Sequence, residues 1–220
     1  MKVTIDEFLE RYPQLVSEKE NILKAYKTIV KCYQNKGKLL VAGNGGSAAD
    51  AEHLVGELMK GFVEPRKIST DFSSKLRSVD SEMGQILGDK LQDVLPAIAL
   101  VGHTALSTAY LNDVDPLLGF AQQLNGYGDV GDVFLAISTS GNSKNILYAC
   151  VVAKAKGMKI VGLTGGTGGK LKEFADEIIV VPENETYKIQ EYHLPIYHWI
   201  CLALEETFCC KIEKDKVFHE

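Results

Sequence analysis

The chain has 220 residues, of which 45% are hydrophobic, and this is enough to bury the core of one domain. The net charge of -5 and the pI near 5.6 argue against nucleic acid as the main partner, because nucleic-acid binding needs a basic surface. No apolar stretch approaches the ~20 residues that span a bilayer, and the N-terminus lacks the apolar core of a signal peptide. The composition predicts a cytoplasmic globular protein with no membrane partner.

The cysteines support the same compartment. They are odd in number, scattered and without C-x-x-C spacing, which favours reduced thiols over a disulfide framework or a cysteine metal site: Cys32, Cys150, Cys201, Cys209 and Cys210.

Helices and buried strands are expected to alternate along the chain. Apolar positions at helical spacing between Ile5 and Tyr33 predict one or two helices with a break near Pro13. Strands are expected at Leu39 to Ala42, Ala97 to Val101, Val133 to Ile137, Lys159 to Leu163 and Ile178 to Val181. Further helices are expected at Ser47 to Phe62, between Val101 and Leu124, and at Lys144 to Lys156, Lys170 to Ala175 and Ile189 to Phe208. This order predicts an α/β fold with a five-stranded parallel sheet covered by helices on both faces.

The stretch from about residue 63 to 95 departs from this order. It is polar and weakly periodic, with a Ser-rich run from Ser69 to Ser78 and at most a short helix around Met83 to Val94. A lid, an oligomer contact and a plain surface excursion are all compatible with it. We therefore expect a single domain over residues 1–220, with an N-terminal helical segment (1–36) and an insertion at about 63–95.

Two strands end in loops of glycine and hydroxyl residues that precede helices. The first loop is Gly43-Asn44-Gly45-Gly46-Ser47, and the second is Ser138-Thr139-Ser140-Gly141-Asn142-Ser143. Glycine lets a backbone approach its ligand, and the free amides of a helix start point at negative charge. Ligands of parallel sheets bind at the carboxyl ends of the strands, where both loops are expected. The pair predicts a site for a phosphorylated small molecule.

Two helices carry side chains that could do chemistry. His53 and Glu57 lie four residues apart on one helical face, where they form either a solvated pair or part of a site. The last helix carries Gln190, Glu191, His193 and His198, which by spacing alone are a polar stripe on an oligomer-facing helix.

Other polar positions have simpler interpretations. Asn112-Asp113 is first expected to be a helix cap in a turn between helices, and His103 a structural or surface residue. The glycine cluster Thr164 to Gly169 fits a strand-to-helix turn and is taken as structural.

Together these motifs resemble the sugar isomerase (SIS) fold and, within it, the bacterial phosphoheptose isomerases. The resemblance rests on both loops, on Asp50-Ala51-Glu52-His53 with Glu57, on Gly162 to Gly165, and on Ile189-Gln190-Glu191 through His198. It implies the conversion of sedoheptulose 7-phosphate to a heptose 7-phosphate, by a cytoplasmic homotetramer with sites at subunit interfaces.

The resemblance also assigns site residues. It implies one Zn²⁺ per subunit, bound by His53, Glu57, Gln190 and His198. It implies Glu57 as the base and His198 as the acid. It implies substrate binding by Asn44, Gly45, Gly46, Ser47, Glu57, Asn112, Asp113, Ser138, Thr139, Ser140, Ser143 and Gln190.

Two features of this assignment leave alternatives open. A carboxylate bound to zinc is a weaker base, so either Glu57 shifts off the metal or Asp113 contributes to catalysis. Gln190 and His198 lie ~12 Å apart along a straight helix. Either Pro195 distorts the helix, or Gln190 precedes it, or ligands come from different subunits.

Three functions are compatible with the sequence. The first is the phosphoheptose isomerase, and the second is an isomerase of another phosphosugar whose pocket the insertion reshapes, since the isomerases have a short link there. The third is a binding module without catalysis, like the relative that binds the replication initiator. That relative lacks the Glu and the final His, whereas this chain keeps Glu57 and His198.

Overall fold

The computed structural model describes residues 4–209, and of Cys209 only the backbone. Its centre is a five-stranded parallel sheet in the order β2-β1-β3-β4-β5, which confirms the predicted fold class. The strands are β1 (Leu39–Ala42), β2 (Ala97–Ala99), β3 (Val133–Ile137), β4 (Lys159–Gly165) and β5 (Glu177–Val181).

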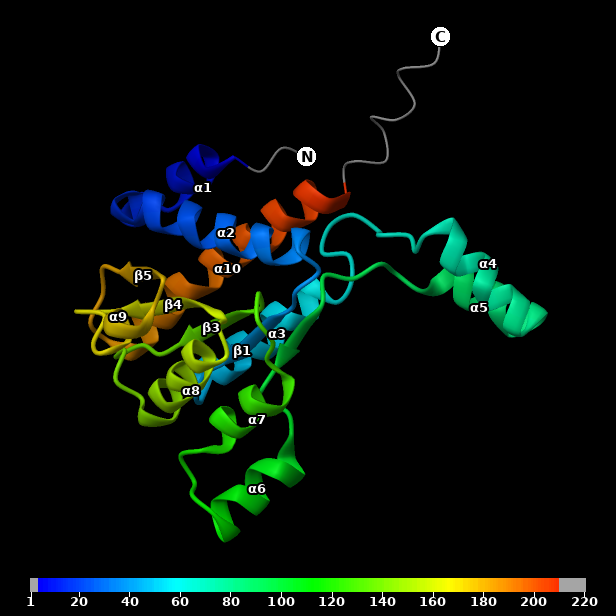
Figure 1. The fold of residues 1–220 in the computed structure, drawn as a ribbon. Coiled ribbons are helices and arrows are strands. Elements are labelled where there is room, and N and C mark those ends of the chain that lie inside the picture. Colours follow the sequence, from blue (N-terminus) through cyan, green and yellow to red (C-terminus); the bar gives the residue numbers. More distant parts are fainter. Residues whose placement is uncertain (1–3, 210–220) are drawn as a thin grey trace.

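Helices cover both faces of the sheet (Figure 1). One face carries α1 (Ile5–Arg11), the 3-10 helix η1 (Pro13–Glu18), α2 (Lys19–Gln34), α3 (Gly46–Leu58) and α10 (Thr186–Cys209). The other face carries α7 (Gly119–Tyr127), α8 (Lys144–Ala155) and α9 (Leu171–Phe174). The expected break near Pro13 is confirmed, because η1 separates α1 from α2.

The strands divide their side chains between two apolar clusters. Leu39 and Val41 point to the cluster under α3 and α10, whereas Leu40 and Ala42 point to the cluster under α8. This alternation follows from the two-residue repeat of a strand, and burial on both faces explains why the strands read as continuous apolar runs. The sheet is thus a rigid base, and both glycine loops begin at its carboxyl edge.

The insertion forms a helical arm, α4 (Thr70–Val79) and α5 (Ser81–Lys90), that projects from the body at the right of Figure 1. The short helix expected around Met83 to Val94 is present as α5, which begins at Ser81 and ends at Lys90, whereas the helix formed by the Ser-rich run, α4, was not expected. Both helices start at capping side chains: Ser69 accepts from Phe72 N (3.2 Å), and Asp80 accepts from Met83 N (2.8 Å). These caps mark the starts of the two helices.

The arm packs mainly on itself. A Cβ on Gly84 would overlap the backbone of Leu76, so glycine there allows α4 and α5 to approach closely. At the base of the arm, its two connecting segments are joined by the antiparallel bridge between Lys67 and Gln92. A hydrogen bond from Leu95 N to Leu58 O (3.0 Å) ties this base to the end of α3. The arm therefore leaves and re-enters the body next to the end of α3.

Two further observations concern the described residues. Cys32, Cys150 and Cys201 are buried free thiols, whereas Cys210 and the Cys209 side chain lie outside the described part. In that part of the chain, no helix has both the length and the apolar character needed to cross a membrane.

Candidate functional site

The two glycine loops lie side by side, as the sequence predicts. They follow β1 and β3, which are neighbours, and the chain leaves β1 toward β2 on the other side, so a crevice opens at this point of the sheet. The Asn44 and Asn145 side-chain amides bridge the crevice with two hydrogen bonds, of 3.0 and 2.8 Å. Asn145 stands in the first turn of α8, so this pair ties the first loop to the helix that follows the second.

The first loop turns sharply into α3. Gly45 has φ of +56°, a conformation that L side chains rarely adopt, and a Cβ on Gly43 would overlap the backbone of Ser47. Ser47 itself is buried, whereas Asn44, Gly45 and Gly46 are exposed. Of the substrate-binding residues expected here, these three are therefore accessible from solvent.

The second loop is held by its own hydroxyls. Ser138 Oγ donates to Ser143 Oγ (3.0 Å), and Ser140 Oγ accepts from Asn142 N (3.2 Å). The carbonyl of Thr139 accepts from Gly165 N at 3.1 Å. The hydroxyls needed for an anion are therefore grouped at the start of α8 before any ligand binds.

The third glycine cluster supports the second loop. Gly141 has φ of +64°, and a Cβ there would overlap the carbonyl of Gly168. Leu171 N donates to Gly141 O at 2.9 Å. These contacts agree with the structural role expected for the cluster.

Two helices meet in the second half of the site. Helices α3 and α10 run side by side, and they bring together His53, Glu57 and His198, which are expected to act on one centre. The His53 and His198 rings are 5.0 Å apart between centroids and nearly perpendicular. His53 Nε2 is 3.4 Å from Glu57 Oε1, and Lys60 Nζ donates to the other carboxylate oxygen at 2.8 Å. Residues 145 positions apart in sequence thus share one cluster.

Tyr197 orients the His53 ring through its hydroxyl group. Its hydroxyl lies 3.0 Å from His53 Nδ1 and donates to Asp50 Oδ1 at 3.3 Å. Burial raises the pKa of the Asp50 carboxyl and of the Tyr197 hydroxyl, and the Asp50 charge adds to the effect on Tyr197. With Nδ1 occupied by Tyr197, His53 presents Nε2 to Glu57.

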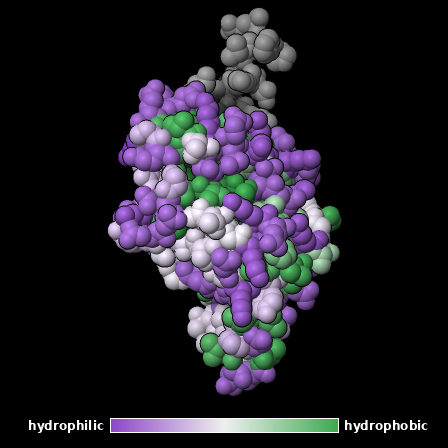
Figure 2. Space-filling model, turned by 90° about the vertical axis from the view of Figure 1, so that its left-hand side faces the viewer, coloured by the Kyte–Doolittle hydropathy of each residue, from purple (hydrophilic) through white to green (hydrophobic). Residues whose placement is uncertain are grey.

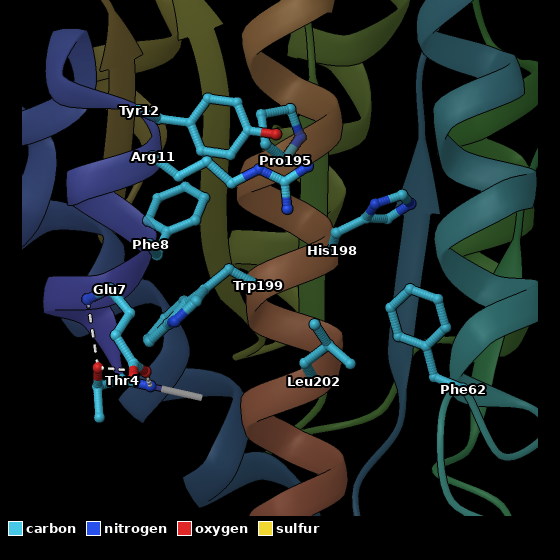
Figure 3. A pocket seen from close by; sticks show the side chains of 10 residues that line it. All are labelled: Thr4, Glu7, Phe8, Arg11, Tyr12, Phe62, Pro195, His198, Trp199 and Leu202. Atoms are coloured by element: carbon cyan, nitrogen blue, oxygen red, sulfur yellow. Dashed lines mark hydrogen bonds between the residues drawn. The ribbon is translucent and has the colours of Figure 1, made fainter. Parts of the chain in front are cut away.

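His198 lies at the centre of the cluster. Its Nε2 is buried without a hydrogen-bond partner, and its ring contacts those of Tyr197 (5.1 Å) and Phe62 (5.3 Å). Burial, with a smaller contribution from His53, lowers the pKa of His198 and so favours the neutral ring. Figure 3 shows His198 and Phe62 among the residues that line a cavity of about 280 Å³ beside α10, with Phe8 and Trp199 on the opposite side.

Gln190 lies at the first glycine loop rather than in the helix cluster. It lies inside α10, which continues past Pro195, so the idea that it precedes the helix was wrong. A Cβ on Gly46 would lie 2.6 Å from Gln190 Nε2, which places the amide against the first loop. Among the described residues, no hydrogen bond joins Gln190 to His53, Glu57 or His198.

The side chains of the helix cluster are of the chemical types that bind metal ions. Imidazole nitrogens and a carboxylate are zinc ligands, and a buried neutral imidazole with an unpartnered Nε2 has a lone pair to give. As placed, no group of three or more His, Cys, Asp or Glu side chains within residues 4–209 is arranged to hold a metal ion. Glu57, which is engaged by Lys60, has to turn for a metal to bind.

Asn112 and Asp113 are not brought to the cluster. They are the last two residues of α6 (Thr104–Asp113), exposed and joined by a 2.7 Å hydrogen bond, so they cap no helix start as first expected. Leu111 lines the cavity beside Asn44, but its two successors do not. The base of Figure 2, where α6 lies in Figure 1, carries apolar patches, and Leu111 and Val114 are 65% and 61% exposed. His103 caps this helix through Nδ1 (3.4 Å to Leu106 N), in line with its expected structural role.

Several residues of the site were missed by the sequence analysis. Tyr197 and Trp199 look like core residues of an apolar helix, and Lys60 and Asn145 like solvated positions. The i,i+3 spacing of Lys60 from Glu57 was the one local signal. The contacts of Asn145 and Tyr197 depend on tertiary proximity.

Comparison with known proteins bears on this geometry. The SIS domain family profile matches residues 5–73 and 90–165, so that most of the arm lies outside it. The chain is 42% identical over 178 residues to the phosphoheptose isomerase of Aneurinibacillus thermoaerophilus, covering 81% of this chain and 77% of that protein. It is 38% identical over 201 residues to phosphoheptose isomerase 2 of Campylobacter jejuni, covering 87% of each.

Solved structures give the same picture. The phosphoheptose isomerase of Neisseria gonorrhoeae superimposes with a TM-score of 0.72 at 30% identity, covering 91% of this chain and 94% of that one. The enzyme from Francisella tularensis superimposes with a TM-score of 0.71 at 31% identity and the same coverage.

Proposed function

Because the chain belongs to the SIS domain family and, within it, to the phosphoheptose isomerases, we propose that it converts sedoheptulose 7-phosphate to D-glycero-D-manno-heptose 7-phosphate. The product is a precursor of heptose for surface polysaccharide. The observation that carries the proposal is the convergence of His53, Glu57 and His198 on adjoining helices, one of which starts at the first glycine loop.

The reaction sets the chemical demands on the site. A proton moves between C1 and C2 of the sugar through an enediol, and another moves between their oxygens. This needs a base near carbon, an acid near oxygen and stabilisation of the enediolate charge. Glu57 is the base of the proposal and His198 the acid, as the family resemblance assigns them, and both side chains lie next to His53.

The loops perform the other task. Exposed amides of the first loop and hydroxyls of the second bind the phosphate and the sugar hydroxyls, at the point where the sheet opens. His53 lies seven residues beyond Gly46, or ~10 Å along α3. A seven-carbon chain with its phosphate at the loops therefore extends toward the helix cluster.

Zinc is part of the proposal. His53, Glu57 and His198 would hold it, with Gln190 as a fourth ligand if its side chain turns away from Gly46. When bound, zinc supplies Lewis-acid polarisation of the sugar carbonyl. Asp113 stays a predicted contributor to catalysis that would have to approach from a moved α6 or from another subunit.

Assembly and location complete the proposal. We expect a cytoplasmic homotetramer with sites at subunit interfaces. The buried free thiols and the exposed apolar side chains of the arm, among them Val79 at 88% and Met83 at 61%, support this expectation. Size-exclusion chromatography with light-scattering detection measures the mass of the assembly.

Turnover tests the function directly. Zinc-loaded protein is supplied with sedoheptulose 7-phosphate and, in parallel, with the phosphates of five- and six-carbon ketoses. The proposal expects product only or chiefly from the seven-carbon sugar, and loss of activity after chelation. Faster turnover of another ketose phosphate would identify a different isomerase, and stabilisation by sugar phosphates without product would identify a binding module.

A further inference from the structure

Arg66 and Glu205 are oppositely charged side chains buried beside the site. Their side chains are 4% and 6% exposed, and Arg66 Nε lies 3.7 Å from Glu205 Oε1. Burying two charges costs free energy that their attraction alone does not recover, unless further hydrogen bonds satisfy both groups. The partners of each group therefore indicate what the pair does.

Glu205 holds the turn that follows α3. One carboxylate oxygen accepts from Phe62 N at 2.7 Å, and the other accepts from Val63 N at 3.0 Å and Glu64 N at 3.3 Å. Three consecutive amides thus point at one carboxylate of α10. Glu205 lies seven residues, two helical turns, after His198 and so on the same side of the helix.

Arg66 holds the end of α3 itself. Its Nη2 donates to the carbonyls of Glu57 (3.2 Å), Leu58 (2.9 Å) and Lys60. The last carbonyls of a helix have no partner within it, and a cation there also favours the helix dipole. One guanidinium therefore closes the helix that carries the proposed base.

The turn between these two anchors touches both reacting groups. Lys60, whose carbonyl is held by Arg66, donates from Nζ to Glu57 at 2.8 Å. Phe62, whose amide is held by Glu205, places its ring 5.3 Å from that of His198. A shift of the turn would move both contacts together.

We propose that Arg66 and Glu205 are positioning residues that set the placement of Glu57 and His198 relative to each other. The pair links α3 to α10 through the 57–64 backbone and acts through that backbone. This inference rests on the proposed function, because positioning is measured on its reaction.

The test removes the charge of Glu205 and compares the effect with that of removing another buried carboxylate charge, far from the site. Glu205→Gln keeps the shape but turns one acceptor into a donor that faces backbone N–H groups. Asp132→Asn is the matched control: Asp132 is 2% exposed and accepts from Lys38 N (2.9 Å) and Asp129 N (2.9 Å), at the opposite end of the strands. Glu205→Asp, which keeps the charge, should recover part of the activity.

The positioning role predicts a specific kinetic pattern. In Glu205→Gln, kcat should fall at least ~10-fold, because small displacements of catalytic groups cost that much or more, while KM changes less than about threefold. Zinc affinity, measured by competition with a chelating dye, should fall about 10-fold as well. Asp132→Asn should lose a similar amount of thermal stability but keep the wild-type kcat and zinc affinity. Wild-type kcat and zinc affinity in folded Glu205→Gln, or an equal loss of both in Asp132→Asn, would overturn the inference.

A double variant covers the case in which Glu205→Gln does not fold. Arg66→Met with Glu205→Leu removes both charges at similar volume, a change that buried pairs often tolerate. It should fold, with the same losses of kcat and zinc affinity, and unchanged values would again overturn the inference. If the wild-type protein binds zinc but does not turn over the sugar, the proposed function is refuted. The zinc affinities of the variants then still decide whether Arg66 and Glu205 position the site.

Discussion

The two halves of the site differ in how they are built. In the helix half, His53, His198 and Tyr197 touch each other directly, and burial lowers the pKa of His198 and raises that of Tyr197. In the loop half, the polar groups belong to exposed backbone and short hydroxyl side chains that glycines place. The difference follows from the two tasks. Proton transfer needs side chains with a controlled environment, whereas an anion needs free N–H and O–H groups. Substitutions in the two halves should therefore change different kinetic constants.

The largest effect is expected in the helix half. Glu57→Gln and His198→Ala should lower kcat by roughly 10²–10⁴-fold, the usual contribution of a general base or acid, with both proteins still folded. Steady-state kinetics with circular dichroism as the folding control measures this. Glu20→Gln, an exposed position on α2, is the matched control for the charge and should behave like the wild type. Normal turnover in either site variant would refute the assigned roles.

A smaller effect is expected in the loop half, where KM rather than kcat should change. Ser143 is the N-cap residue of α8 but makes no capping hydrogen bond, so Ser143→Ala leaves the helix start intact. Loss of one hydroxyl from a phosphate costs about 1.5–3 kcal/mol, which raises KM roughly 10- to 100-fold while kcat changes little. A fall in kcat at unchanged KM would show that the second loop takes part in the chemistry.

Gln190 tests the boundary between the halves. If its amide serves the first loop, as its place against Gly46 indicates, Gln190→Ala should raise KM and lower zinc affinity less than His198→Ala does. Competition with a chelating dye gives both affinities under the same conditions. An equal loss of zinc in the two variants would show that Gln190 swings to the helix cluster and is a full ligand.

The smallest effect is expected at the bridge between the loops. Asn145→Ala removes both hydrogen bonds to Asn44, which are exposed and worth together about 1–2 kcal/mol. KM should rise up to about 10-fold, and the Tm should fall by only a few degrees. A large loss of stability instead would mean that the amide pair holds the sheet edge together rather than the ligand site.

The sequence predicted the frame of the site better than its contacts. The sheet and both loops follow from apolar runs that end in glycine, a local signal. The α4 helix was missed because its run of serines was taken as a sign of a loop, although Phe72, Leu76 and Val79 stand at helical spacing and Ser69 caps the helix start. Asn112-Asp113 was first expected to cap a helix in a turn, and the family resemblance implies substrate binding there, whereas the two residues form the exposed end of α6. The roles of Tyr197 and Glu205 depend on contacts across more than 140 residues, as Arg66 depends on Glu205 for its ion pair, and no local pattern encodes such contacts.

Isomerisation in heavy water tests the central claim most directly. Zinc-loaded protein is incubated with sedoheptulose 7-phosphate in D₂O and followed by proton NMR. The account predicts anomeric signals of an aldose 7-phosphate that carries deuterium at C2, because the enediol exchanges its proton with solvent through the base. An unchanged ketose spectrum with zinc-loaded, folded protein would contradict the account.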